Sequence, residues 1–352
     1  MRVVLSGYYG FDNAGDEALL SAITSSLKTR HPEIDFVVFS GNPQRTSLLH
    51  GISAVYYMNP FKVIKELKRA DLLISGGGSI FQDVTSLRSF LYYLSIVALA
   101  KILGCPVMFY AQGIGPLNRK ISRFMMRFIA EKVDIITLRD EESGRFLRSL
   151  GVKRDYKVTA DPVFSLKPDV KIGEDLLFEI KDNVDMPVVG VSVRPWSDLA
   201  GYEKPLAEAL DYLMEKGYKI VFMPLSYPED AREARKIADL MNHRPYIIDR
   251  PLSSREHLAL ISRLHFVIGM RLHSLIFAAI SRVPFAGISY DPKVEAFLKQ
   301  FDLTPLNMKN PKIREELKSL LEDPTLRRKI DEKTEELTKK AEENVALALT
   351  LL

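Results

Sequence analysis

The sequence predicts an α/β protein made of two successive doubly wound domains. Short apolar runs rich in β-branched residues alternate with longer amphipathic segments, which is typical of a parallel sheet covered by helices on both faces. The alternation stops in the charged stretch Lys167–Pro187 and then restarts. The chain has 352 residues, which at roughly 100 to 200 residues per domain is consistent with two domains. Hydrophobic residues make up 47 % of it, which excludes a disordered or fibrous protein.

The first domain is expected over residues 1–170. Its predicted strands are apolar runs of about four or five residues bounded by Gly, Pro or Asp: Val3–Ser6, Phe36–Phe39, Leu72–Ser75, Val107–Ala111 and Ile135–Leu138. Between them lie helical patterns such as Ala18–Lys28, whose leucines and isoleucine share one face. The charged stretch Lys167–Pro187 contains two prolines and is expected to be a linker with a short helical turn.

The second domain is expected over residues 171–310, followed by charged helices over 311–352. Its predicted strands are Val188–Val193, Ile220–Met223, Tyr246–Ile248, Phe266–Ile268 and Phe285–Ser289. Helical patterns separate them, and Pro324 starts a second helix in the charged tail. Ligands of open α/β sheets bind beyond the carboxyl ends of the strands, so we expect the site in a cleft that the two domains face.

The charge and hydrophobicity of the chain indicate which classes of binding partner to expect. The net charge is only +4 and the two signs are interleaved, so no nucleic-acid partner is expected. This mildly basic balance fits anionic small molecules or transient contact with an acidic membrane surface. No apolar run approaches the roughly 18 residues of a membrane span, and the first residues form a strand instead of a signal peptide. We therefore expect a cytoplasmic protein.

Cysteine and histidine give little sign of redox or metal chemistry. The single cysteine, Cys105, is expected to be a small buried hydrophobe in a reducing compartment. Five histidines have no metal-like companions and are interpreted as surface or helix residues: His31, His50, His243, His257 and His265. The prediction is therefore that the protein has no metal site.

A glycine-rich loop, Gly7–Glu17, follows the first predicted strand. Its spacing differs from the dinucleotide-binding G-x-G-x-x-G pattern, so a nicotinamide cofactor is disfavoured. Glycines let the backbone approach a ligand, and the following helix N-terminus attracts anions. A ligand loop is the favoured interpretation. For Asp16 and Glu17 the alternative is that they complement the helix dipole.

Two further small-residue loops follow later strands of the first domain. They are Ile74–Asp83, with three successive glycines, and Tyr110–Pro116. Backbone N–H groups exposed by such glycines suit sugar or diphosphate oxygens. The alternative is a crowded crossing of strand and helix that requires small residues. Asp161, after another short apolar run, fits a buried cap as well as a ligand contact.

In the second domain, cations follow the strands directly. Arg194 ends one apolar run, while Arg271 and His273 lie where a buried strand turns into an apolar helix. A buried guanidinium requires an anionic partner, and none is close in sequence. An anion-binding pocket is therefore predicted, the alternative being an ion pair with an acid from elsewhere in the fold. Lys293 follows the next strand and is either a further cation of the pocket or a solvated helix residue.

Taken together, these motifs resemble the polysaccharide pyruvyl transferases. The resemblance covers roughly residues 1–300 and is carried by G-x-x-G-x-x-N-x-G-D-E, G-G-G-S-I-F-Q-D, Q-G-I-G-P, V-S-V-R and G-M-R-L-H, in that order. It is strongest to the CsaB-like branch that acts on bacterial cell walls. The resemblance implies two Rossmann-like domains in a glycosyltransferase-B-like arrangement. It also implies transfer of the enolpyruvyl skeleton of phosphoenolpyruvate to a sugar as a 4,6-ketal, with release of phosphate.

The resemblance also implies roles for individual residues. Phosphoenolpyruvate would be bound by Arg194, Arg271, Leu272, His273 and Lys293, with Arg271 and His273 catalytic. The acceptor would be bound by Asn13, Asp16, Gly78, Gln82 and Gln112. Imidazole titrates near neutral pH, so His273 is the expected proton carrier. No cofactor is implied.

The implied acceptor is N-acetylmannosamine in a lipid-diphosphate-linked disaccharide, or a polymeric glycan. A lipid-linked acceptor would bring the protein to the inner face of the membrane as a peripheral partner. Two other functions stay open at the level of sequence: a nucleotide-sugar-dependent glycosyltransferase of the same fold, and a non-catalytic phosphosugar-binding module. The first requires a base-and-ribose site where this sequence offers cations instead.

Overall fold

The computed structural model describes residues 1–84, 86–180, 186–196, 201–289 and 291–352. The chain divides into two compact units. The N-terminal unit comprises Met1–Asp12, Asp16–Ser165 and Leu337–Leu352, and the C-terminal unit comprises Asn13–Gly15 and Leu166–Glu336. Three residues of the first glycine-rich loop thus group with the C-terminal unit. The expected boundaries were 170 and 310, whereas the units divide at 165 and 336.

The N-terminal unit contains a seven-stranded parallel sheet. Its spatial order is β3 (Ser53–Tyr56), β2 (Asp35–Ser40), β1 (Arg2–Tyr9), β4 (Leu72–Gly76), β5 (Val107–Gln112), β6 (Ile135–Leu138) and β7 (Lys157–Val158). The five predicted strands are confirmed. Two further strands were not predicted: β3, whose central residues are only half-buried, and β7, which has two residues. The order reverses between β1 and β4, so the first two glycine-rich loops leave the sheet at its switch point.

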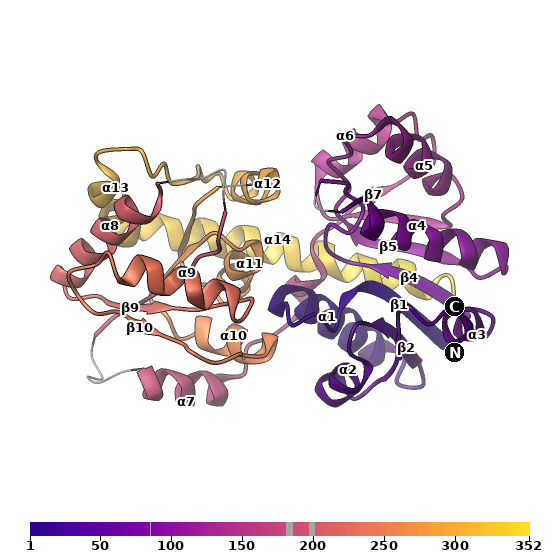
Figure 1. The fold of residues 1–352 in the computed structure, drawn as a ribbon, viewed down its shortest axis with the longest axis horizontal. Coiled ribbons are helices and arrows are strands. Elements are labelled where there is room, and N and C mark those ends of the chain that lie inside the picture. The colour runs from indigo at the N-terminus through magenta and orange to yellow at the C-terminus, as the bar shows by residue number, and fades with distance from the viewer. Residues whose placement is uncertain (85, 181–185, 197–200, 290) are drawn as a thin grey trace. The chain divides into compact units, whose positions relative to one another are not determined.

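Helices cover this sheet, as Figure 1 shows for α1 to α6. They are α1 (Ala14–Arg30), α2 (Pro43–His50), α3 (Pro60–Leu67), α4 (Leu87–Ile102), α5 (Lys120–Ala130) and α6 (Glu141–Ser149), with a 3₁₀ turn, η1 (Pro162–Ser165). Val4 and Phe109 belong to one buried cluster, and Val3 and Leu5 to another. Successive residues of β1 therefore fill different cores, as expected for a sheet buried on both faces.

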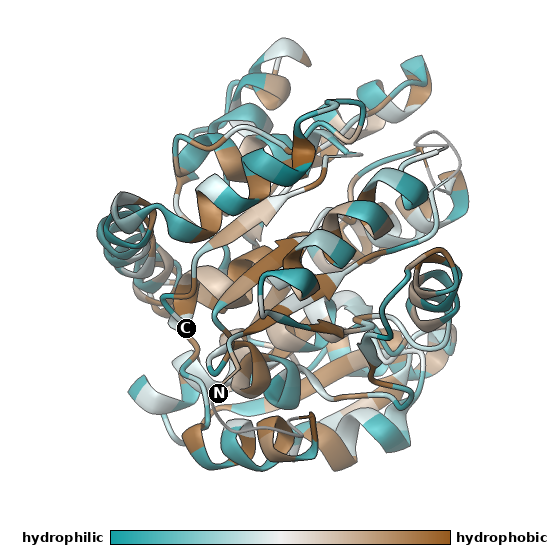
Figure 2. Ribbon diagram, turned by 90° about the vertical axis from the view of Figure 1, so that its left-hand side faces the viewer, coloured by the Kyte–Doolittle hydropathy of each residue, from teal (hydrophilic) through white to brown (hydrophobic). Residues whose placement is uncertain are grey.

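The C-terminal unit contains a five-stranded parallel sheet. Its order is β10 (Tyr246–Ile247), β9 (Lys219–Phe222), β8 (Val188–Ser192), β11 (Phe266–Gly269) and β12 (Phe285–Gly287). All five predicted strands are confirmed. The strands are mainly brown in the hydropathy view, and the helices alternate between brown and teal (Figure 2). This pattern matches buried parallel strands covered by amphipathic helices.

The helices of the C-terminal unit are α7 (Val170–Ile180), α8 (Glu203–Glu215), α9 (Glu229–Ala238), α10 (Ser254–Ile261), α11 (Leu272–Ile280), α12 (Pro292–Gln300) and α13 (Ile313–Glu322). The expected linker with a short helical turn is wrong for residues 170–180, which form the whole of α7; residues 181–185 of that stretch lie outside the described ranges. Helix α7 packs on α10 because Gly173 has no side chain: a Cβ there would lie 2.3 Å from the carbonyl oxygen of Ala259.

Helix α14 (Pro324–Leu349) begins at the predicted proline and contributes to both units. In the C-terminal unit, the Thr334 hydroxyl donates to the carbonyl oxygen of Ala279 at 3.2 Å. In the N-terminal unit, the Thr159 hydroxyl donates to Oδ1 of Asn344 at 2.8 Å, and Val345 joins a core cluster. The helix therefore supplies packing to each unit separately.

Candidate active site

The two predicted pocket arginines follow the strands at the switch point of the C-terminal sheet. The strand order reverses between β8 and β11, and Ser192 pairs with Gly269 at their carboxyl ends. Arg194 and Arg271 each lie two residues beyond this pair. Because the strands are parallel, both arginines emerge at the same edge of the sheet. This edge is where doubly wound domains bind their ligands.

Arg271 has an acidic partner that the sequence analysis did not identify. Its Nε donates to Oδ2 of Asp230 at 2.9 Å, and its Nη2 donates to Oδ1 at 2.5 Å. Asp230 is fully buried and also accepts a hydrogen bond from the backbone N–H of Ser226 at 2.9 Å. The ion pair with an acid from elsewhere in the fold, stated above as the alternative, is therefore present.

This ion pair leaves part of the guanidinium for other partners. An arginine has five N–H donors, and Asp230 uses two of them. The planar, bidentate contact fixes the direction in which the other three point. Asp230 lies 41 residues before Arg271, in the first turn of α9. The distance along the sequence gives no sign of this contact. The one available signal is that Asp230 is an acid at the start of a helix.

Arg271 also precedes the buried helix α11 directly. It is the N-cap residue, and its side chain makes no capping hydrogen bond. Gly269 allows the close turn, because a Cβ there would lie 2.4 Å from the Ser274 hydroxyl oxygen. The side chain of Leu272 is buried, so the backbone is the part of Leu272 suited to contact an anion.

His273 lies against a segment from the other end of the chain. A Cβ placed on Gly15 would lie 2.1 Å from Nδ1 of the imidazole, so the glycine backbone packs on the ring. The neighbouring residues are held by backbone contacts: Asn13 forms an antiparallel bridge with Ser226, and the N–H of Ala14 donates to Leu225 at 3.2 Å. The structure thus brings predicted acceptor residue Asn13 into the unit that contains the predicted donor residues.

Arg194 is supported by an aromatic side chain and by its own backbone. Its guanidinium lies 4.9 Å from the ring centroid of Trp196. The Tyr202 hydroxyl is 3.2 Å from the Arg194 carbonyl oxygen and donates to Glu233 at 2.8 Å. Burial, together with the hydrogen bond to Glu233, raises the pKa of Tyr202 well above its usual range. This tyrosine therefore stays protonated and acts as a fixed donor beside the strand end.

Lys293 lies in the first turn of α12, the helix that follows the next strand of the same sheet, β12. Its Nζ is 3.2 Å from Oδ2 of Asp291, the N-cap residue of that helix. The lysine charge is therefore partly offset by a local carboxylate. The preceding Tyr290 lies outside the described residues. Arg194, Arg271 and Lys293 thus follow the adjacent strands β8, β11 and β12.

In the N-terminal unit, Gln112 supports the glycine-rich loop after β4. Gln112 is fully buried, and its Nε2 donates to the carbonyl oxygens of Gly77 at 3.3 Å and Gly78 at 3.0 Å. Both glycines have positive φ, 67° and 72°, which other residues rarely adopt. Gln112 thus lies beneath the loop, whereas the resemblance implied direct contact with the acceptor.

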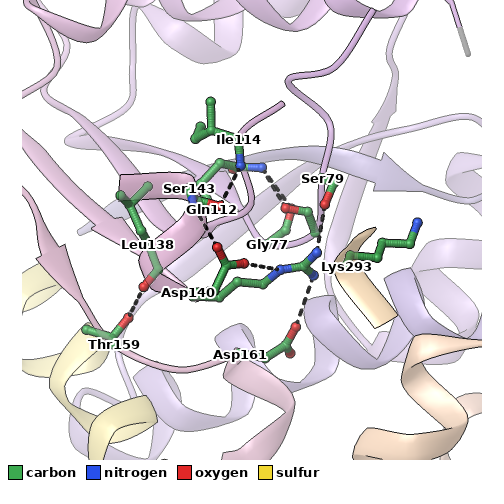
Figure 3. Close-up of polar contacts among 12 residues, drawn as sticks. Gly77, Ser79, Gln112, Ile114, Leu138, Asp140, Ser143, Thr159, Asp161 and Lys293 are labelled. Atoms are coloured by element: carbon green, nitrogen blue, oxygen red, sulfur yellow. Dashed lines mark hydrogen bonds and ion pairs between the residues drawn. The ribbon is translucent and has the colours of Figure 1, made fainter. Parts of the chain in front are cut away.

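A buried arginine that the sequence analysis missed braces the same loop. Nη2 of Arg139 donates to the hydroxyl oxygen of Ser79 at 2.7 Å, and Nη1 lies 3.4 Å from Oδ2 of Asp161 (Figure 3). Asp161 also accepts from the backbone N–H of Val163 at 3.1 Å, so it is a buried cap, one of the two expected alternatives. Arg139 directly follows β6, which was the available signal.

The other predicted acceptor residues have local partners. Oε1 of Gln82 accepts from the N–H of Val84 at 2.9 Å, and Asp16 lies beside Gly78. Burial and the Asp16 carboxylate both raise the pKa of Tyr9. Glu17 closes the first loop, because its Oε1 accepts from the N–H of Gly10 at 2.8 Å. Its role is thus more than complementing the helix dipole.

Among the five isolated histidines, His257 is buried and the side chain of His50 is only 5 % exposed. Nε2 of His50 is 2.7 Å from Oε2 of Glu17, and His257 is 0 % exposed with its nitrogens 3.0 Å from two backbone carbonyl oxygens. Burial lowers the pKa of His257. Within the described ranges, no group of three or more His, Cys, Asp and Glu side chains is arranged to hold a metal ion. None of the described helices is both long and apolar enough to cross a membrane.

A sequence profile described as "Polysaccharide pyruvyl transferase" matches residues 13–292, which is most of the chain. The chain belongs to this family. A curated relative, the amylovoran biosynthesis protein AmsJ of Erwinia amylovora, is 21 % identical over 275 residues, covering 63 % of this chain. The match spans 65 % of that relative's length, slightly under two thirds.

Solved structures establish the fold of this member of the family. The UDP-GlcNAc 2-epimerase of Neisseria meningitidis bound to UDP-GlcNAc is 17 % identical, with a TM-score of 0.69 over 99 % of this chain and 100 % of that one. The ADP-heptose heptosyltransferase II of E. coli is 14 % identical, with a TM-score of 0.52 over 91 % and 98 %. The predicted glycosyltransferase-B-like fold with two parallel α/β sheets is confirmed.

Proposed function

We propose that this family member transfers the enolpyruvyl skeleton of phosphoenolpyruvate to two hydroxyl groups of one sugar. The first hydroxyl oxygen bonds to C2 while C3 takes a proton, which gives a phosphorylated ketal. The second hydroxyl oxygen then bonds to C2, the C2–O bond to phosphate breaks, and inorganic phosphate leaves with the proton that this hydroxyl group gives up. The observation that carries the proposal is the position of Arg194 and Arg271, side by side at the switch point of the C-terminal sheet.

Phosphoenolpyruvate, the proposed donor, would be bound mainly by positively charged side chains. Phosphoenolpyruvate carries nearly three negative charges at neutral pH, so it requires several donors within a small volume. Arg194 and Arg271 supply planar forks that suit carboxylate and phosphate, and the first N–H groups of α11 add donors. Asp230 keeps the fork of Arg271 oriented. Lys293 adds the third cation, and all these groups stabilise the phosphate as it departs.

His273 is the proposed proton carrier to C3. Imidazole is the side chain suited to proton transfer near neutral pH, and His273 follows Arg271 by two residues. Packing of its ring on the Gly15 backbone holds it in one orientation. A positioned general acid contributes on the order of 10² to 10⁴ in rate. Arg271 is the second catalytic residue, because it would stabilise charge on the leaving phosphate.

For the acceptor we propose N-acetylmannosamine of a lipid-diphosphate-linked disaccharide, converted to a 4,6-ketal for cell-wall polymers. Asn13, Asp16, Gly78 and Gln82 are the proposed contacts, with Gln112 acting from beneath the loop. The support is the glycine loop at the switch point of the N-terminal sheet, which Gln112 braces through hydrogen bonds to the carbonyl oxygens of Gly77 and Gly78. A lipid-linked acceptor would place the enzyme in the cytoplasm at the inner face of the membrane.

The test measures phosphate release from phosphoenolpyruvate with a panel of synthetic lipid-diphosphate disaccharides and free glycans. Release should require an acceptor with two suitably placed hydroxyl groups. In parallel, phosphoenolpyruvate should raise the thermal unfolding temperature, whereas uridine diphosphate sugars should leave it unchanged. Stabilisation by a uridine diphosphate sugar alone would instead favour the nucleotide-sugar glycosyltransferase. Binding of phosphoenolpyruvate without turnover on any acceptor would favour the phosphosugar-binding module.

A further inference from the structure

Helix α5 of the N-terminal unit exposes an apolar stripe. Ile121, Phe124 and Phe128 are 57, 66 and 55 % exposed, although large apolar side chains are normally buried. At 3.6 residues per turn they fall within about 60° of the helix circumference, so they form one continuous strip. An exposed apolar strip of this kind on a folded protein marks an interaction surface.

A basic stripe runs beside the apolar one. Lys120, Arg123 and Arg127 are exposed and occupy the adjoining 60° or so of the same helix. The helix contains no acidic residue, and within the described part of the chain no carboxylate forms an ion pair with these three cations. The charge is thus available to an external anionic partner.

The helix is held firmly by its other face. Met126 and Ile129 are buried in the core of the unit. The Asp83 carboxylate accepts hydrogen bonds from the backbone N–H groups of Asn118 at 2.7 Å and Arg119 at 3.0 Å, which fixes the helix start. Asp83 ends the glycine-rich G-G-G-S-I-F-Q-D motif. The exposed stripes therefore belong to a rigid element and keep their relative positions.

We propose that α5 docks the enzyme on a membrane surface rich in anionic lipids. A helix with basic side chains beside exposed aromatic ones lies in the interfacial plane, with its apolar face among the acyl chains and its cations at the headgroups. Charge complementarity favours this occupant, since the stripe offers three cations and no anion. The inference does not depend on the proposed donor or acceptor, and vesicle binding tests it without any measurement of activity.

The experiment is co-sedimentation of the full chain with vesicles of phosphatidylcholine containing phosphatidylglycerol, and with vesicles of phosphatidylcholine alone. We expect binding to the anionic vesicles that weakens as salt rises. Lys120→Gln with Arg123→Gln should lower the partition coefficient about 30-fold, at about 1 kcal/mol per basic residue. Phe124→Ser with Phe128→Ser should lower it at least as much. These surface positions should leave the thermal unfolding temperature nearly unchanged.

Matched controls distinguish binding through α5 from nonspecific binding through other exposed apolar or basic side chains. Phe178→Ser removes a phenylalanine that is 83 % exposed on α7, next to Glu179, and should not alter binding. Lys309→Gln with Lys312→Gln removes the same charge elsewhere and should have little effect. Equal binding by wild type and the α5 variants would overturn the proposal, as would equal binding to neutral vesicles. So would a dimer that the phenylalanine substitutions dissociate while vesicle binding persists.

Discussion

The backbone of Gly15 lies directly against the imidazole of His273, although the two residues are far apart in sequence. A Cβ atom on Gly15 would lie 2.1 Å from Nδ1 and 2.5 Å from Cγ of the ring. No positive φ requires glycine here, so the contact with His273 is the reason that a side chain is excluded. Gly15, in the N-x-G part of the first motif, therefore forms the surface on which the ring of the proposed proton carrier packs.

We predict that Gly15→Ala slows turnover by displacing the His273 ring. Proton transfer depends steeply on position, so phosphate release should fall at least about tenfold while the melting temperature changes little. The check is a double-mutant cycle with His273→Ala. Once the ring is absent, the added methyl group has nothing to displace, and Gly15→Ala should cost nearly nothing further. Equal losses in both backgrounds would contradict the contact as the cause.

His273→Ala should lower turnover sharply and spare donor binding. Loss of a general acid lowers kcat by about 10² to 10⁴, whereas the arginines that hold the donor remain. The measurements are steady-state phosphate release and the thermal shift that phosphoenolpyruvate produces. Turnover that survives in His273→Ala would remove the histidine from the mechanism. Loss of the thermal shift would assign it to donor binding instead.

Substitutions in the Arg271–Asp230 pair should separate protein stability from activity. Asp230→Asn leaves the guanidinium without its buried counter-ion, so unfolding should become easier by about 3 kcal/mol. A second change, Arg271→Leu, removes the stranded charge and should restore much of that stability. It should not restore activity, because the proposed clamp is then absent. Recovery of phosphate release in the double variant would show that the pair is only structural.

The sequence predicted the strands well because their apolar runs are short, continuous and clearly bounded. It gave no sign of β3, which is partly exposed, or of β7, whose two residues include an exposed lysine. Helix α7 was mistaken for a linker because the stretch Lys167–Pro187 is rich in charge and the two prolines of that stretch flank the helix. What holds it in place is the contact of Gly173 with α10, which only the folded chain reveals.

The site was predicted residue by residue, but its internal partners were not. Arg194 and Arg271 stood out because each comes just after a buried strand, and His273 because it lies at the start of a buried helix. Asp230 was missed because its partner lies 41 residues away in sequence, and Arg139 was missed although it directly follows β6. Gln112 illustrates the same limit: the sequence placed it beside the glycine loop, and only the packing shows that it lies beneath.

The reactivity of the Cys105 thiol tests whether this side chain is buried in the core of the N-terminal unit. Burial raises the pKa of its thiol to about 11. Because the folded pKa exceeds the unfolded value of about 8.5, the thiol stabilises the fold below pH 8.5 and loses that contribution as pH rises toward 11. The single cysteine should therefore react slowly with iodoacetamide at pH 8 and rapidly after denaturation. Fast labelling of the folded protein would contradict this burial.

Arg139→Gln should weaken acceptor use without changing donor binding. The change removes the charged contact with Ser79 and loosens the glycine-rich loop that Gln112 supports from below. If that loop binds the acceptor, the acceptor KM should rise several-fold while the thermal shift with phosphoenolpyruvate stays the same. Arg145→Gln, an exposed arginine on the neighbouring helix α6, is the matched control and should behave as wild type. An unchanged acceptor KM in Arg139→Gln would exclude the loop from acceptor binding, because a buried brace cannot be weakened without altering the loop that it holds.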